Sequence, residues 1–101
     1  MIFLGSYDEI TPNKGYPSMK NSMMKSRYKN QDKIVRYLRH GKLVMVAAGL
    51  PRPDVFTGET IKGTYGIMSD DVYAWSSMLP YYVDKYNLKL PDDFERHIGV
   101  I

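Results

Sequence analysis

Adjacent carboxylates occur twice, as Asp70 with Asp71 and as Asp92 with Asp93, and they are the residues best suited to metal or acid–base chemistry. Such pairs can hold a divalent cation or share acid and base roles when other ligands converge on them. The first pair lies in a predicted hairpin turn, where Asp is favoured for its turn geometry. The second pair opens a predicted helix, where negative charge complements the helix dipole. We therefore expect both pairs to be structural and expect no metal ion.

The other residue types complete no catalytic or cofactor motif. The chain has no cysteine, and its two histidines, His40 and His97, are far apart in the sequence, so we expect each at a helix end and no zinc site. No serine lies in a nucleophile elbow, and the glycines between residues 58 and 66 are not followed by the Lys-Ser/Thr step of a phosphate loop. We predict that the protein is not an enzyme and binds no cofactor.

The central part of the chain has the clearest periodicity. Apolar residues recur at helical spacing after Asn30, a capping residue type, and predict a helix over residues 31–40. A continuous apolar run predicts a short buried strand over 43–48. Two prolines predict a stiff, exposed loop over 49–53.

The second half of the chain predicts a small sheet and a second main helix. Residues 54–75 alternate between strand-forming residues and turns and predict a β-meander. A stripe of apolar residues predicts a helix over 77–87, which Asn87 ends in a left-handed conformation, and residues 91–97 predict a short closing helix. The expected fold class is α+β, with a small antiparallel sheet packed against two main helices.

Length and composition indicate one domain of 101 residues. We expect residues 1–30 to form a strand or arm that is partly loop, and residues 31–101 to form the compact α+β core of the same domain. The absence of cysteine fits a reducing compartment, and no apolar run is long enough for a membrane span. A cytoplasmic protein without a membrane contact is expected.

Basic residues are concentrated in residues 14–42, which we call the basic segment. It holds nine bases and one acid, a charge of +8, whereas residues 43–101 carry a charge of −3. Such a segment can steer an acidic protein surface or a nucleic-acid backbone toward the chain. A solvated lysine-rich surface, or neutralisation by the acidic half within the fold, would explain the same pattern.

The composition also favours a protein interface, because Tyr, Trp, Met and Arg are enriched at interface centres and the chain has nine Tyr and seven Met. Tyr81 and Lys85 share the side of the predicted helix opposite its apolar stripe, and Arg52 lies between two prolines. These three residues are candidate contacts, and Arg36 and Arg39 are candidates for steering a partner. Trp75 is expected in the core, because it ends a strand inside the meander.

Residues 54–59, 69–75, 79–86 and 90–94 resemble a set of small bacterial proteins of uncharacterised function, over about residues 31–97. In size and composition the chain is also similar to immunity proteins, which neutralise toxins by covering them. We expect a non-enzymatic protein-binding module, in its sharpest form an immunity protein or inhibitor that occludes an acidic-surfaced partner such as a toxin. The alternative is a nucleic-acid-binding regulator that uses the basic segment.

Overall fold

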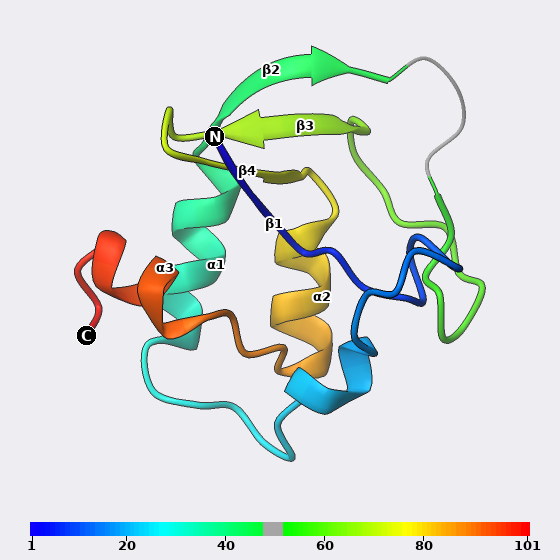
Figure 1. Ribbon diagram of the computed structural model, residues 1–101, viewed down its shortest axis with the longest axis horizontal. Helices are drawn as coiled ribbons and strands as arrows, with labels where there is room; N and C mark the ends of the chain where they lie inside the picture. Colours follow the sequence, from blue (N-terminus) through cyan, green and yellow to red (C-terminus); the bar gives the residue numbers. More distant parts are fainter. Residues whose placement is uncertain (48–51) are drawn as a thin grey trace.

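A four-stranded sheet carries α1 and α2 on one side in the computed structural model, which describes residues 1–47 and 52–101 (Figure 1). The elements in chain order are β1 (Ile2–Leu4), the 3-10 helix η1 (Met19–Ser22), α1 (Gln31–Arg39), β2 (Lys42–Val46), β3 (Gly66–Ser69), β4 (Tyr73–Ser76), α2 (Leu79–Tyr86) and α3 (Asp92–His97).

The strand order is β1-β4-β3-β2. Neighbouring strands β2, β3 and β4 are antiparallel, whereas β1 pairs with β4 in parallel. The α+β class is therefore confirmed, with a mixed rather than wholly antiparallel sheet. The parallel pair arises because β1 reaches β4 from the distant N-terminus and not through a hairpin.

The predicted helices are confirmed, and their ends differ in detail. Asn30 makes no side-chain cap for α1; it has a left-handed backbone with φ 69°, and the buried Gln31 side chain accepts a hydrogen bond from the Tyr28 amide at 2.9 Å. Asn87 ends α2 with φ 54°, the left-handed conformation that Asn tolerates. His40 follows the last turn of α1 and His97 is the last residue of α3, as expected.

The strands depart further from prediction. β2 forms where a strand was predicted, but the expectation that it is buried is wrong, because β2 lies at the edge of the sheet and all five residues are exposed. Within the predicted meander only β3 and β4 are strands, and residues 54–65 form loops with one isolated bridge, from Pro53 to Thr60. The end of the predicted 43–48 strand and part of the predicted 49–53 loop lie outside the described residues.

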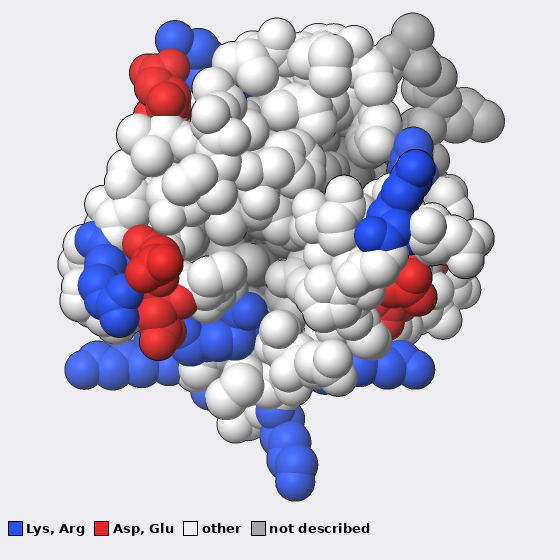
Figure 2. All heavy atoms as spheres, in the orientation of Figure 1, with Lys and Arg blue, Asp and Glu red and all other residues white. Residues whose placement is uncertain are grey.

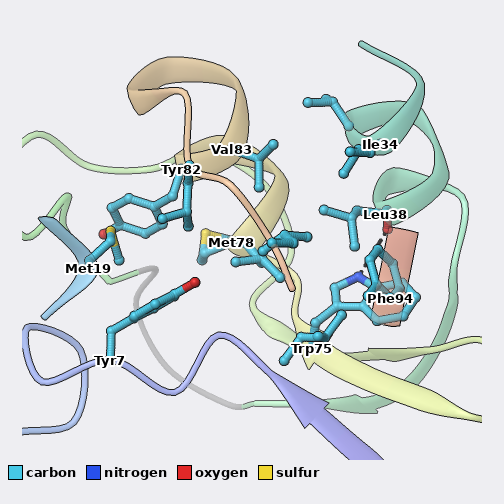
Figure 3. Close-up of a cluster of buried hydrophobic side chains, with 14 of the residues drawn as sticks. Tyr7, Met19, Ile34, Leu38, Trp75, Met78, Tyr82, Val83 and Phe94 are labelled. Atoms are coloured by element: carbon cyan, nitrogen blue, oxygen red, sulfur yellow. Dashed lines mark hydrogen bonds between the residues drawn. The ribbon is translucent and has the colours of Figure 1, made fainter. Parts of the chain in front are cut away.

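The core lies between the sheet and the helices. Trp75 is fully buried, as expected, and its indole Nε1 donates to the Leu38 carbonyl at 3.1 Å. Residues 1–30 add Leu4, Tyr7 and Met19 to this core. In Figure 3 the side chains of Trp75, Phe94 and Leu38 gather at one end of the core, and those of Tyr7, Met19 and Tyr82 at the other.

Candidate binding surface

The two edge strands carry most of the exposed apolar side chains. Twelve large hydrophobic residues are exposed among the described residues, and seven of them lie in β1 or β2 or next to β1. Those seven are Met1, Ile2, Phe3, Leu43, Val44, Met45 and Val46. Exposed fractions along β2 rise from 42% at Leu43 to 62% at Val46, so a whole strand of apolar side chains faces solvent.

The strand register shows which side chains point away from the helices. Trp75 points into the core, so its strand neighbours Ala74 and Ser76 point to the opposite face. Cross-strand partners share a face, which gives two outward rows. They are Phe3, Ala74, Ser69 and Lys42, and Ser76, Ile67 and Met45.

We call these two rows the open face. In the described part of the chain no helix lies over it (Figure 1). Met1 folds toward it, since the Ser69 hydroxyl donates to the Met1 sulfur at 3.4 Å. Lys42, at the edge, is the one charged residue among the seven of the open face, and Ala74 and Ser69 are buried. In Figure 2 the strands lie under a largely uncharged surface, and Lys and Arg side chains project from the lower edge of the view.

The basic segment is only partly neutralised. Arg27 pairs with Asp32 and, at 3.2 Å, with Asp84, and Arg39 lies 3.8 Å from the same Asp84 carboxylate. The other bases of the segment make no ion pair within the part of the chain that the structure describes: Lys14, Lys20, Lys25, Lys29, Lys33, Arg36 and Lys42. All seven are exposed, so the segment keeps a positive field at the surface.

Tyr81 and Lys85 lie in one cluster around the buried carboxylate of Asp54. The Tyr81 and Tyr86 hydroxyls donate to Asp54 at 2.7 and 2.6 Å, and the Lys85 ammonium lies 3.5 Å from the same oxygen. Burial by itself would raise the pKa of Asp54, but these hydroxyls and the amides of residues 56 and 57 hold the pKa below its usual value. Tyr81 is half-buried and its hydroxyl is occupied, so it is not the exposed side chain that the helix pattern predicts.

Arg52 is exposed, as predicted, and lies in the part of the chain between β2 and β3. Its guanidinium lies over the Tyr65 ring at 5.4 Å from the centroid. Pro51, the first of the two prolines expected to hold it, lies outside the described residues, whereas Pro53 is described and bridges to Thr60. The structure therefore places the five predicted contact residues in three regions, with Arg36 and Arg39 on α1, Tyr81 and Lys85 on α2, and Arg52 alone.

A second carboxylate cluster, around Asp70, has no signal in the sequence beyond a turn. One Asp70 oxygen accepts from the amides of Val72 and Tyr73 at 3.0 and 2.7 Å, as an Asp in a turn does. The other oxygen accepts from the Tyr37 hydroxyl at 2.5 Å and lies 2.8 Å from His97 Nε2. Tyr37 and His97 are distant in sequence, so no local pattern could pair them with Asp70.

The hydrogen bonds of this cluster keep Asp70 charged. Burial would raise the pKa of Asp70, but the hydrogen bonds that it accepts outweigh burial and lower its pKa to about 2. Burial and the contact with Asp70 raise the pKa of Tyr37 to about 12. Asp70 therefore joins the β3–β4 turn to α1 and α3 as a charged acceptor. No group of three metal-ligating side chains occurs in residues 1–47 and 52–101.

Comparisons with protein-family models, with curated proteins and with solved structures give no match to this chain. None of the described helices is both long enough and apolar enough to cross a bilayer.

Proposed function

We propose that the protein is a small non-enzymatic module that binds another protein through the open face and β2. The supporting observation is the concentration of exposed apolar side chains on β1 and β2. Exposed apolar side chains that gather along one strand, as four do on β2, are typical of an interaction site. In its sharpest form the module is a cytoplasmic inhibitor or immunity protein that occludes an acidic-surfaced partner.

The partner contact has two parts with different physical roles. The unpaired bases of the basic segment attract an acidic surface and raise the rate of encounter. The apolar side chains of β2 then lose water on contact, and the outer backbone edge of β2, which no strand covers in the described residues, offers hydrogen bonds to a partner strand. We expect changes in the basic segment to alter association, and changes in β2 to alter dissociation.

Substitution of Met45 tests the apolar part. Met45 is 58% exposed and points away from the core, so Met45→Glu should leave the melting temperature unchanged. The matched control is Ile101→Glu, which adds the same charge at an exposed apolar residue at the C-terminus. We expect tagged wild-type protein and the control to retain the same stoichiometric protein from the lysate of the host after nuclease treatment, and Met45→Glu to lose it. Equal retention by all three proteins contradicts the proposal.

Nucleic-acid binding is the second candidate, and the seven exposed, unpaired bases of the basic segment favour it. It predicts binding to DNA or RNA that weakens steeply with salt, because phosphate contacts release counterions. The double variant Lys33→Glu with Arg36→Glu should abolish that binding, whereas Met45→Glu should leave it intact. Absence of salt-sensitive binding to single- and double-stranded probes rejects this candidate.

A further inference from the structure

A cavity of about 460 Å³ lies between the sheet, the start of α2 and two loops, residues 5–16 and 52–65. Its walls are mostly apolar and include Phe3, Ile61, Tyr65, Ile67, Leu79 and Tyr82. The volume falls within the range of small-molecule sites, which are mostly apolar with few polar groups. At a water's share of about 30 Å³, it has room for roughly 15 non-hydrogen atoms.

One charged side chain lines the cavity. Among the described residues of the wall, Arg52 is the sole Lys, Arg, Asp or Glu. Its guanidinium lies over the Tyr65 ring and makes no ion pair in the described part of the chain, unlike Arg27, Arg39 and Arg96. Arginine stays charged at any physiological pH and its planar fork matches a carboxylate. The wall therefore combines an apolar body with one available anion-binding group.

Hydrogen bonds hold both loops of the cavity in place. Asp54 and its tyrosine partners fasten the 52–65 loop to α2, and the Val55 amide donates to the Tyr82 hydroxyl at 3.1 Å. On the other side, the Glu9 carboxylate accepts from the Met19 amide at 2.7 Å and from the Ser18 hydroxyl at 2.6 Å. A preformed cavity loses less free energy on ordering when it binds a ligand.

We propose that this cavity binds a small amphipathic monocarboxylate, with its apolar chain or ring against the sheet and α2 and its carboxylate on Arg52. The charge of the wall selects the ligand class, since its described residues include one cation and no acid, which favours one anionic group and disfavours a cation. The cavity shares Phe3, Ile67 and Ser76 with the open face, but binding of a carboxylate on Arg52 does not depend on the protein contact proposed for β2.

The test uses three probes of one chain length, octanoate, 1-octanol and octylammonium, titrated calorimetrically into the full chain at pH 7. We expect octanoate to bind at least about tenfold more tightly than 1-octanol, because a charge-assisted hydrogen bond contributes that much or more. Octylammonium should bind more weakly than both. Equal affinities for octanoate and octylammonium, or no binding of octanoate at millimolar concentration, overturn the proposal.

Two variants locate the site. Arg52→Gln should reduce octanoate affinity to that of 1-octanol without changing 1-octanol binding, whereas Arg96→Gln, an exposed arginine outside the cavity, should change neither. Ile67→Trp fills the cavity and should abolish binding of both, with Val72→Trp as the exposed control. Octanoate affinity that is unchanged in Arg52→Gln refutes the assignment even if Ile67→Trp fails to fold.

Discussion

Replacing Asp70 with Asn tests the clamp between the β3–β4 turn and two helices. Asn has the same shape and keeps the oxygen that accepts from the amides of Val72 and Tyr73. The change replaces the other oxygen, which faces Tyr37 and His97, with an uncharged amide group. Asp70→Asn therefore removes the charge and puts a donor in place of the acceptor that faces Tyr37 and His97, while the hydrogen bonds of the turn remain.

The magnitude follows from the pKa. Hydrogen bonds outweigh the effect of burial and hold the pKa of Asp70 at about 2, below its usual 3.8. At about 1.4 kcal/mol for each tenfold change in proton affinity, the charged form contributes about 2 kcal/mol to the free energy of unfolding at pH 7. Because the folded-state pKa is the lower one, this contribution is complete above about pH 5 and is lost as the pH falls toward 2.

Urea unfolding, monitored by circular dichroism, measures this change in the free energy of unfolding. We expect Asp70→Asn to unfold about 2 kcal/mol more easily than the wild type at pH 7, with the difference falling below about 1 kcal/mol at pH 2.5. Asp71→Asn is the matched control, because Asp71 is exposed and its left-handed backbone, with φ 77°, suits Asn. A difference that is the same at both pH values, or that Asp71→Asn reproduces, refutes the role assigned to the Asp70 charge.

Two further substitutions probe the core and the Asp54 cluster. A Cβ at Gly41 would lie 2.6 Å from Trp75 Cζ2, so Gly41→Ala should lower the free energy of unfolding by about 1–3 kcal/mol; an unchanged melting temperature contradicts this packing. Tyr86→Phe removes a hydrogen bond to the buried Asp54 and should destabilise by about 1–3 kcal/mol, whereas Tyr16→Phe, at an exposed tyrosine, should not. Equal thermal unfolding of the two Phe variants argues against the cluster.

Local patterns predicted the helices because their determinants lie within a few residues of one another. The apolar stripe of α1 and the Asn that ends α2 act through neighbours in the sequence, and both appear where expected. Trp75 was placed in the core for a similar reason, its position within a strand.

The position of β2 could not be predicted in the same way. A continuous apolar run is typical of a buried strand, but burial depends on which strands flank it in the sheet. Here β1 takes the place beside β4, and β2 is left at the opposite edge. Strand order is a property of the whole chain, so the exposed apolar surface of β2 emerges only in the structure.

The two carboxylate clusters could not be predicted from local sequence either. The sequence predicts Asp70 in a turn, which is confirmed, and Tyr81 exposed on a helix, which is wrong because Tyr81 is half-buried. Their partners come from other elements, Tyr37 from α1 for the first and Asp54 from a loop for the second. The Tyr81 hydroxyl, which the helix pattern predicts to be free, donates to Asp54, and only the tertiary fold brings the two residues together.

Exposed apolar side chains concentrate on the two edge strands, and this distribution bears on function. In the described residues no buried side-chain nitrogen or oxygen lacks a hydrogen-bond partner, and the clusters around Asp54 and Asp70 fasten loops and turns to the helices. Two residues of the open face add to these contacts, because the Ser69 hydroxyl hydrogen-bonds within the β3–β4 turn and the Ser76 hydroxyl accepts from the Met78 amide. Edge strands that serve the fold alone commonly carry charges or proline against aggregation, yet the one charge in β2 is Lys42 at its start. A charge at Met45 would leave the core contacts untouched, so a role in partner contact accounts for an apolar residue there.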